Sequence, residues 1–352
     1  MSTRRGRPRQ ADIARVAGVS QATVSLVLGG SETAQGLTVD TRRRVLDAAR
    51  DLGYVPDPAA RRLVARNNRL LGVYTFMATF PVDFRNSYYP FLVGVEEEAA
   101  EQGYDLLLFT GSTAEPDASG LNRLRLADGC VLIGRHAPAE ELLRLLDDDF
   151  PIVYVGRNDS VGGRLPYVGA DYVRASADVV AELVRQGHRR LCYVREHDQA
   201  VATLDREEGF RLGLRETGAD GVIVRTDGAD LTPDRLRGWL AEGVTALVVE
   251  ATDTQTAANA LRVAAASAEL ACPRDFSLAM LGEEVYPPPD GPVVAGFAVP
   301  RREMGRRAAR MLIGLLSGDR AAGRQELLAC DSVAGDTTGP PPRRSRSTVD
   351  PR

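Results

Sequence analysis

Arginine side chains are concentrated at the start of this sequence. Five of them fall within residues 4–15, and Asp12 is the only acidic residue before Glu32. A guanidinium group binds phosphate and carboxylate oxygens through paired N–H donors, so such a cluster is suited to a polyanion. Residues 1–69 carry thirteen arginines and six acidic residues, a charge of +7, and because the whole chain carries −4, the remaining residues carry −11. We therefore expect only the head of the chain to meet the polyanion.

Small polar side chains follow these arginines in the segment Ser20–Ser25, which reads Ser-Gln-Ala-Thr-Val-Ser. Ser20 can cap a helix, and Gln21, Ala22, Thr23 and Ser25 then form its outer face. The alternative is a generic packing helix, which the charge and the polar face both disfavour.

Patterns for catalysis or metal binding are not found in the sequence. The four cysteines, at positions 130, 192, 272 and 330, fit neither a zinc site nor a small disulfide framework, so we interpret them as reduced core thiols. Of three histidines, His188 lies in a Gly-His-Arg-Arg turn and is interpreted as structural. No dinucleotide, P-loop, zinc-protease or hydrolase motif occurs. We expect no enzymatic activity, no cofactor and no metal.

The sequence also gives no sign of a membrane segment. It contains no run of about 18 apolar residues, and its basic N-terminus lacks the apolar stretch of a secretory signal. We expect a cytoplasmic protein without a membrane partner.

Three short helices are predicted in the head. Ile13, Val16 and Ala17 repeat at helical spacing, and Gly18 follows where a helix commonly ends in a left-handed residue. Two short helices joined by such a turn form a helix-turn-helix. The second helix has the apolar residues Val24, Val27 and Leu28, and the third has Thr38 as cap, Val45, Leu46, Ala48, Ala49 and Leu52 as its buried face, and Gly53 at its end.

The head resembles the DNA-binding domain of the lactose-repressor (LacI/GalR) family of bacterial transcription regulators. The segments that carry the resemblance are DIARVAGVSQATVSLVLGG, from Asp12, and GYVPDPAARRL, from Gly53. The resemblance implies that the second helix lies in the major groove. It assigns base contacts to Gln21 and Ala22, assigns contacts to phosphates and packing to Thr23 and Ser25, and includes Ser20 and Leu26 among the DNA-binding residues. Leu26 departs from the family, which usually has a polar or basic residue there.

A short segment after the head, residues 57–69, has the signals of a brief helix. Asp57 is suited to the cap and Pro58 to the first helical position, but about two turns are marginal alone in water. A simple linker is one interpretation. The family resemblance instead implies a hinge helix that orders on DNA, with Leu63 wedged into the minor groove, Ala60 facing the groove and Arg61 near phosphates.

From Leu70 onwards, short apolar runs alternate with amphipathic helical stretches. Buried parallel strands are predicted in two series: LLGVYTF, YDLLLFTG, GCVLIG and PIVYVGR, and then RRLCYV, GVIVRT, ALVVEAT and FSLAML. This alternation, run twice, predicts two doubly wound α/β lobes with a ligand site between them, at the carboxyl ends of the strands.

The body, residues 70–338, resembles the periplasmic-binding-protein fold that this family carries as its effector sensor. The resemblance places Tyr88, Tyr89, Arg157, Arg206, Asp253 and Glu283 in the effector cleft, with Arg206 gripping ligand oxygens. Gly156 and Gly282 stand where the family commonly has aspartates. Two acceptors for sugar hydroxyls are thereby lost, and the effector stays open among a sugar, a nucleoside-like compound and another polar metabolite.

The sequence thus predicts a small all-α helix-turn-helix head (1–56), a hinge (57–69), a two-lobe α/β body that binds effector and dimerises (70–338), and a disordered tail (339–352). The predicted function is a ligand-responsive repressor that binds a near-palindromic operator as a homodimer. Two alternatives are a solute-binding protein for transport and an α/β enzyme with a regulatory head.

Overall fold

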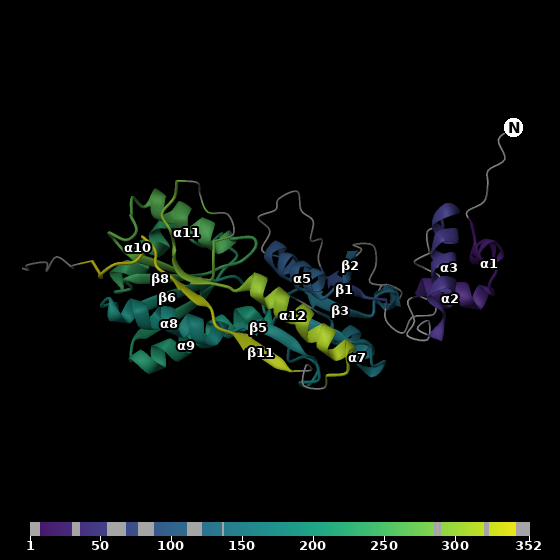
Figure 1. The fold of residues 1–352 in the computed structure, drawn as a ribbon. Helices are drawn as coiled ribbons and strands as arrows, with labels where there is room; N and C mark the ends of the chain where they lie inside the picture. Colours follow the sequence, from purple (N-terminus) through teal and green to yellow (C-terminus); the bar gives the residue numbers. More distant parts are fainter. Residues whose placement is uncertain are drawn as a thin grey trace, which may run out of the picture. The chain divides into compact units, whose positions relative to one another are not determined.

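A computed structural model describes residues 8–29, 36–54, 68–76, 88–110, 122–135, 137–284, 287, 290–319 and 324–342 (Figure 1). The chain divides into two compact units, Met1–Asn68 and Arg69–Arg352. No single helix in these ranges is long and apolar enough to cross a membrane; only the bent pair α1 and α2, in the first unit, meets the length and composition limits when taken together.

The first unit is built from α1 (Gln10–Ala17), α2 (Gln21–Gly29) and α3 (Val39–Asp51). Ile13, Val24 and Val45, one from each helix, are fully buried against one another. Helix α1 ends at Gly18 in the left-handed conformation (φ 66°), and the chain turns by 106° into α2. A residue with a Cβ is strained at such a φ, which is why glycine ends this helix. The predicted helix-turn-helix head is confirmed.

Two apolar residues of the head, Val16 and Leu46, were predicted to face its core, and this prediction is wrong. Val16 is 57 % exposed and Leu46 is 44 % exposed. Helices this short bury only one narrow stripe, which in α1 is formed by Ile13 and Ala17. Val16 lies on the flank of that stripe, about 100° of helical rotation away from Ala17.

The second unit contains two six-stranded sheets in its described residues. The sheet of lobe 1 has the order β11-β5-β4-β3-β1-β2, and that of lobe 2 has the order β12-β10-β9-β8-β6-β7. All pairings are parallel except that of β10 with β12, which is antiparallel. The strands of lobe 1 are β1 (Leu70–Thr75), β2 (Asp105–Thr110), β3 (Gly129–Ile133), β4 (Ile152–Val155), β5 (Tyr167–Ala170) and β11 (Gln325–Leu328). Those of lobe 2 are β6 (Arg190–Arg195), β7 (Asp220–Arg225), β8 (Ala246–Glu250), β9 (Ser277–Leu281), β10 (Ala295–Ala298) and β12 (Asp331–Val333).

Helices cover these sheets, as expected for doubly wound lobes (Figure 1). Lobe 1 has α5 (Tyr89–Glu101), α7 (Ala139–Asp147), α12 (Arg301–Leu316) and the 3-10 helix Arg123–Leu126. Lobe 2 has α8 (Tyr172–Arg185), α9 (Val201–Thr217), α10 (Pro233–Ala241) and α11 (Thr256–Ser267). The chain passes between the lobes three times, after β5, after β10 and after β11. The predicted two-lobe α/β body is confirmed.

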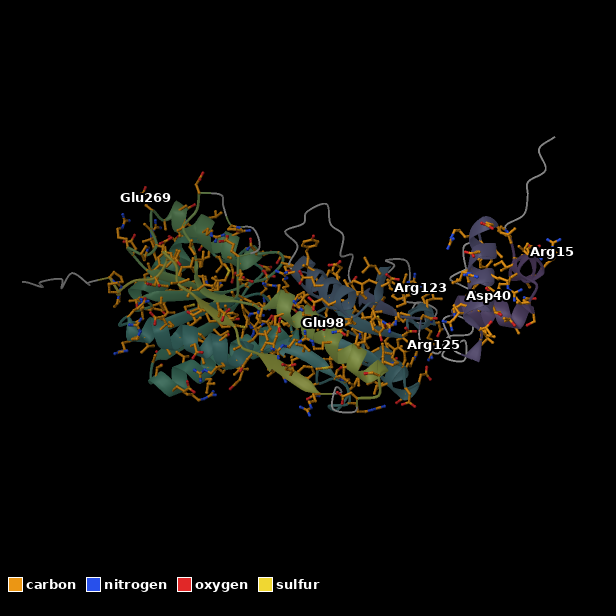
Figure 2. All side chains as sticks on the ribbon, in the orientation of Figure 1. Arg15, Asp40, Glu98, Arg123, Arg125 and Glu269 are labelled. Carbon is orange, nitrogen blue, oxygen red and sulfur yellow. The ribbon has the colours of Figure 1, made fainter. Side chains whose placement is uncertain are left out.

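Helices α5 and α12 cross at very short distance. A Cβ on Gly94 of α5 would stand 1.9 Å from the Arg302 carbonyl oxygen of α12, so only glycine fits at this contact. Beside it, fully buried Glu98, labelled in Figure 2, accepts two hydrogen bonds from Arg310 at 2.7 and 2.9 Å. This pairing fixes α12 on lobe 1, although α12 follows a strand of lobe 2.

The prediction that all strands are buried is wrong for β2 and β7, each of which lies at one edge of its sheet. Leu108 of β2 is 45 % exposed and Val222 of β7 is 40 % exposed. Each strand has a neighbour on one side only. The strands β5, β10, β11 and β12, which have only three or four residues each, were not predicted from the sequence.

His188 fastens the segment after β12 to lobe 2. Its Nδ1 lies 2.8 Å from Thr245 Oγ1, and its Nε2 lies 3.0 Å from Ser277 Oγ and 2.9 Å from the Gly339 carbonyl oxygen. The ring is fully buried, in agreement with its structural interpretation. Residues 343–352 of the predicted tail lie outside the described residues.

Burial lowers the pKa of His188 below its ordinary value of 6.5, although the hydrogen bond to Gly339 opposes this. The unfolded chain therefore binds the proton more readily, so stability present at pH 7 is lost as the pH falls below about 6.5. We expect the urea midpoint of the wild type to fall more between pH 7.5 and pH 5.5 than that of His188→Gln. Equal pH dependence in the two proteins would contradict this role, whatever their absolute stabilities.

Candidate DNA-recognition surface and effector cleft

Helix α2 presents one polar face to solvent. Gln21, Ala22, Ser25 and Leu26 are exposed, whereas Val24 and Val27 are buried against α1 and α3. Two apolar residues one turn apart therefore anchor the helix while the intervening positions face outwards. Leu26, at 37 % exposure, is the large apolar residue on this outer face.

Ser20 and Thr23 hold the start of α2. The Ser20 Oγ accepts a hydrogen bond from the Thr23 backbone N–H at 3.1 Å, and the two hydroxyl oxygens lie 2.9 Å apart. This cap satisfies a backbone donor that has no partner inside the helix. Ser20 and Thr23 therefore position α2, whereas Gln21, Ala22, Ser25 and Leu26 remain available to a partner.

Exposed arginines lie on the other two helices of the head, α1 and α3. Arg15, Arg43 and Arg50 pair with aspartates three residues away on their own helices, at 3.0, 2.7 and 3.3 Å. Exposed pairs of this kind are worth about 0–1 kcal/mol, so phosphate oxygens can replace the aspartates at little cost. The hinge residues Ala60, Arg61 and Leu63 lie outside the described residues, and their roles stay predictions.

Arg206 is buried in lobe 2, at 5 % exposure, rather than lying on the surface of its helix. On the second turn of α9, it donates from Nε to the Leu281 carbonyl oxygen at 2.8 Å and from Nη1 to the Ala202 carbonyl oxygen at 3.1 Å. Its guanidinium group lies 4.0 Å from the centre of the Tyr172 ring and its Nη1 lies 3.8 Å from Glu250. These contacts fix the guanidinium group at the carboxyl ends of β8 and β9.

Tyr88 and Asp253 bring the two lobes together in the same region. Tyr88 immediately precedes α5 of lobe 1 and is 8 % exposed, whereas Asp253 follows β8 of lobe 2. Burial, and secondly the charge of Asp253, raise the pKa of the Tyr88 hydroxyl far above its ordinary value. Tyr89 is half exposed, at 50 %, so of the two tyrosines it is Tyr88 that the structure places inside.

Arg157 and Glu283 are both engaged in ion pairs. Arg157, after β4 of lobe 1, donates to both carboxylate oxygens of Asp205 in α9, at 3.0 and 2.5 Å, and also pairs with Asp159. Glu283, after β9, pairs with Arg301. A hollow of about 470 Å³ lies beside the Arg157–Asp205 pair and is also lined by Tyr172. Its volume falls in the range of small-molecule sites.

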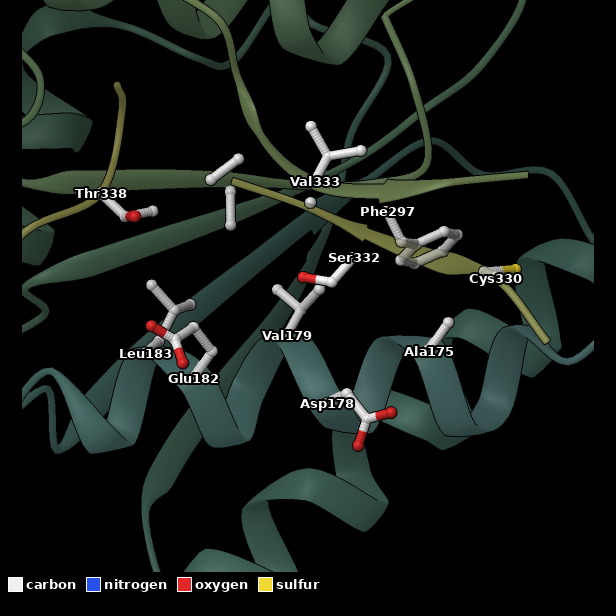
Figure 3. A pocket seen from close by; sticks show the side chains of 13 residues that line it. Ala175, Asp178, Val179, Glu182, Leu183, Phe297, Cys330, Ser332, Val333 and Thr338 are labelled. Carbon is white, nitrogen blue, oxygen red and sulfur yellow. The ribbon is translucent and has the colours of Figure 1, made fainter. Parts of the chain in front are cut away.

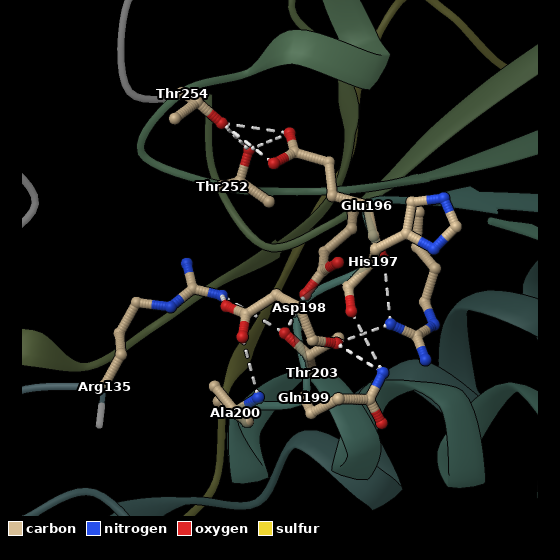
Figure 4. A network of polar contacts seen from close by, with 12 residues as sticks. Arg135, Glu196, His197, Asp198, Gln199, Ala200, Thr203, Thr252 and Thr254 are labelled. Atoms are coloured by element: carbon tan, nitrogen blue, oxygen red, sulfur yellow. Dashed lines mark hydrogen bonds and ion pairs between the residues drawn. The ribbon is translucent and has the colours of Figure 1, made fainter. Parts of the chain in front are cut away.

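A second polar network, which was not predicted from the sequence, joins the two lobes (Figure 4). Arg135, just after β3 of lobe 1, pairs with Asp198 and donates to Thr203 Oγ1 at 3.2 Å, both in lobe 2. The Thr203 hydroxyl in turn donates to Glu250 at 2.5 Å. Arg135, Asp198 and Glu250 all lie at or just after strand ends, so the rule for the carboxyl edge of parallel sheets could have identified them.

A further hollow, between α8 and the β10–β12 edge, measures only about 80 Å³ (Figure 3). Phe297, Val333 and Ala175 are among its lining residues. This volume is well below that of a typical small-molecule site, so the effector cleft is assigned to the strand ends instead.

Family models match both units of the chain. Residues 180–338 match the periplasmic binding protein-like domain. Residues 11–57 match the model for bacterial regulatory proteins of the lacI family. This range contains α2, α3 and all of α1 except its first residue. The chain belongs to the lacI family. The predicted resemblance is confirmed for head and body.

Named relatives of this lacI-family chain are helix-turn-helix regulators. It is 29 % identical over 331 residues to the HTH-type transcriptional regulator CelR of Thermobifida fusca, covering 90 % of this chain and 94 % of CelR. It is also 29 % identical over 350 residues to the HTH-type transcriptional regulator PtxS of Pseudomonas aeruginosa, covering 96 % and 97 %. The predicted class, a transcriptional regulator, is confirmed.

Solved structures share the fold of the lacI-family chain. The lac repressor dimer bound to operator and the anti-inducer ONPF matches with a TM-score of 0.71 and 20 % identity, covering 95 % of this chain and 99 % of that one. The CelR–cellobiose complex matches with a TM-score of 0.60 and 23 % identity, covering 94 % and 100 %. At these identities the likeness concerns the fold.

Proposed function

We propose that this regulator is a repressor that binds a near-palindromic operator as a homodimer in the cytoplasm, and that it acts by binding rather than by catalysis. The observation that carries the proposal is the outer face of α2, which a cap and two buried valines hold rigidly in a head of charge +7. A twofold DNA site is matched by a twofold protein. The lac repressor structure with operator, a dimer, supports this assembly.

The contacts to DNA divide into three groups. Gln21, Ala22, Ser25 and Leu26 face the base edges, while Ser20 and Thr23 hold the helix in position. In the hinge, residues 57–69, Leu63 and Ala60 enter the minor groove and Arg61 neutralises phosphates. In this assignment residues 1–56 form the DNA-binding domain, residues 70–338 bind effector and dimerise, and residues 339–352 form a tail whose first residue, Gly339, is held on lobe 2 by His188 and Ser277.

The effector is a small polar molecule that binds between the lobes. Tyr88 of lobe 1 is near enough to Asp253 of lobe 2 for the charge of Asp253 to act on its hydroxyl, and Arg206 lies at the ends of β8 and β9. The hollow beside Arg157, lined also by Tyr172 on which Arg206 stacks, has the volume for such a ligand. Tyr89 and Glu283 lie at the margin of this region, half exposed and paired with Arg301 respectively. The two lobes are joined by three passages of the chain. In this proposal, effector binding moves one lobe relative to the other, and this movement changes the spacing of the two hinge segments in the dimer and so the affinity for DNA.

Selection of bound sequences from a random 30-base-pair duplex library by the full-length protein tests this function. We expect a single motif with twofold symmetry. Leu63→Ala should then weaken binding to the selected duplex by more than about 1 kcal/mol in fluorescence anisotropy, since a lost specific contact costs at least this much. Recovery of no motif would overturn the regulator function, whereas a normal affinity of Leu63→Ala would overturn only the hinge wedge.

A further inference from the structure

One guanidinium group of lobe 1 is inserted among carboxylates of lobe 2. Arg135 pairs with Asp198 and reaches the Thr203 hydroxyl at 3.2 Å, although these residues lie more than 60 positions apart in the chain. Figure 4 shows Arg135 pointing from its own strand end towards Asp198 and Thr203 at the start of α9. Only about a quarter of the side chain of each ion-pair partner remains exposed.

Three acidic residues act on this single cation. Burial alone lowers the pKa of the Arg135 guanidinium group, but Asp198, Glu250 and Asp253 together outweigh it and raise the pKa. All three acidic residues belong to lobe 2: Asp198 follows β6, Glu250 ends β8 and Asp253 follows β8. The cation therefore comes from one lobe and its anionic surroundings from the other.

Glu250 is the member of this group with an incomplete set of hydrogen bonds. It is 1 % exposed; its Oε1 accepts from the Thr203 hydroxyl, and Arg206 lies at 3.8 Å. Its Oε2 has no hydrogen-bond partner among the residues that the structure describes. Buried carboxylate oxygens without a donor are rare because the lost hydration is not replaced. Burial accordingly raises the pKa of Glu250, against the opposing effect of Arg206.

Arg206 does not supply the missing donor. Its Nε and Nη1 are engaged with the Leu281 and Ala202 carbonyl oxygens, and its plane lies over the Tyr172 ring. If lobe 1 moves away, Arg135 leaves with it. The cations then left near the three carboxylates are Arg206 and Arg195, and Arg195 is already paired with buried Glu207. An arriving group with several N–H donors and a positive charge fits these surroundings, whereas an anion is repelled.

We propose that Asp198, Glu250 and Asp253 form a cation subsite in lobe 2, which Arg135 fills in the effector-free protein and which an ammonium or guanidinium group of the effector takes over. The inference rests on the proposed effector cleft and names the chemistry of its ligand. Arg135 then acts as an internal competitor. Removing it should increase the affinity of the subsite for a small organic cation.

The test uses the full-length chain and methylguanidinium as the probe, with potassium chloride at equal ionic strength as the reference. Thermal unfolding and titration calorimetry are measured for wild type, Arg135→Ala and Arg135→Gln. The second variant keeps most of the side-chain volume in case the first does not fold. Arg164→Ala, which removes an exposed ion pair with Asp147 elsewhere in lobe 1, is the matched control.

We expect saturable binding of methylguanidinium at millimolar concentration to the Arg135 variants, at least tenfold tighter than to wild type or Arg164→Ala. Adding Glu250→Gln to Arg135→Ala should remove that gain. Equal binding to all variants, or a gain that survives Glu250→Gln, overturns the subsite. Operator affinity of the same samples is measured in parallel, so that a failed cation subsite with intact operator binding is distinguished from a failure of the regulator function.

Discussion

Replacement of Arg206 by alanine is expected to lower the free energy of unfolding by about 3–5 kcal/mol, the usual cost of removing one partner from a buried ion pair. The side chain is 5 % exposed and donates to two backbone carbonyl oxygens, of Leu281 and Ala202. Its loss removes the side-chain donor from those carbonyl oxygens and withdraws the nearest cation from buried Glu250, 3.8 Å away. The stacking on Tyr172 is lost as well.

Arg211 provides the matched control on the same helix. It pairs with buried Glu207, but its own side chain is 46 % exposed and Glu207 keeps Arg195 and Arg225 as partners. Arg211→Ala should therefore cost less than about 1 kcal/mol in the same urea titration. A cost below about 1 kcal/mol for Arg206→Ala would show that its buried contacts are not maintained in solution.

Arg206 also allows stability to be separated from effector response. Arg206→Lys keeps the charge beside Glu250 but cannot reproduce the geometry of the guanidinium contacts. Under conditions where it is folded, we expect unchanged operator affinity, because the head forms its own compact unit, together with a weakened response to effector. An unchanged response would remove Arg206 from the effector site.

Long apolar runs made most of the body predictable. Strands such as β3 and β8 are continuous apolar runs because both faces of a parallel sheet are covered, and the two predicted ranges differ from the observed ones by one or two residues at one end. The strands β10 and β12 could not be identified in this way. Each has only three or four residues, and their pairing depends on segments that meet only in the folded chain.

The sequence could identify single residues of the site, but not the pairs that these residues form across the two lobes. Arg206 was singled out by the family resemblance, and the structure places its guanidinium group at the strand ends; its contact with an effector stays a prediction. The pairs Arg135–Asp198 and Arg157–Asp205 could not be identified, because each joins residues of different lobes. Nothing near Arg135 in the sequence shows that its partner lies 63 residues further on.

Replacement of Leu26 by arginine is expected to change the half-site that the regulator selects. Leu26 lies on the exposed face of α2 between the buried residues Val24 and Val27, so a longer polar side chain can be accommodated without disturbing the core. An arginine there can bind guanine through two N–H groups, a contact worth about 1–3 kcal/mol of discrimination in each half-site. Sequences selected from a random library should therefore differ between wild type and Leu26→Arg.

A control variant has to separate the effect of the added charge from the effect of placing it at position 26. Leu46 of α3 has a similar exposure, 44 %, and lies in the same unit but off helix α2, so Leu46→Arg adds the same charge away from the recognition face. If either arginine reaches a phosphate instead of a base, the slope of log affinity against log salt steepens by about 1.8 for a dimer, without a change of motif. We expect a new motif for Leu26→Arg and the wild-type motif for Leu46→Arg. If both variants select the wild-type motif, Leu26 does not face the bases, and the orientation assigned to α2 on DNA is wrong.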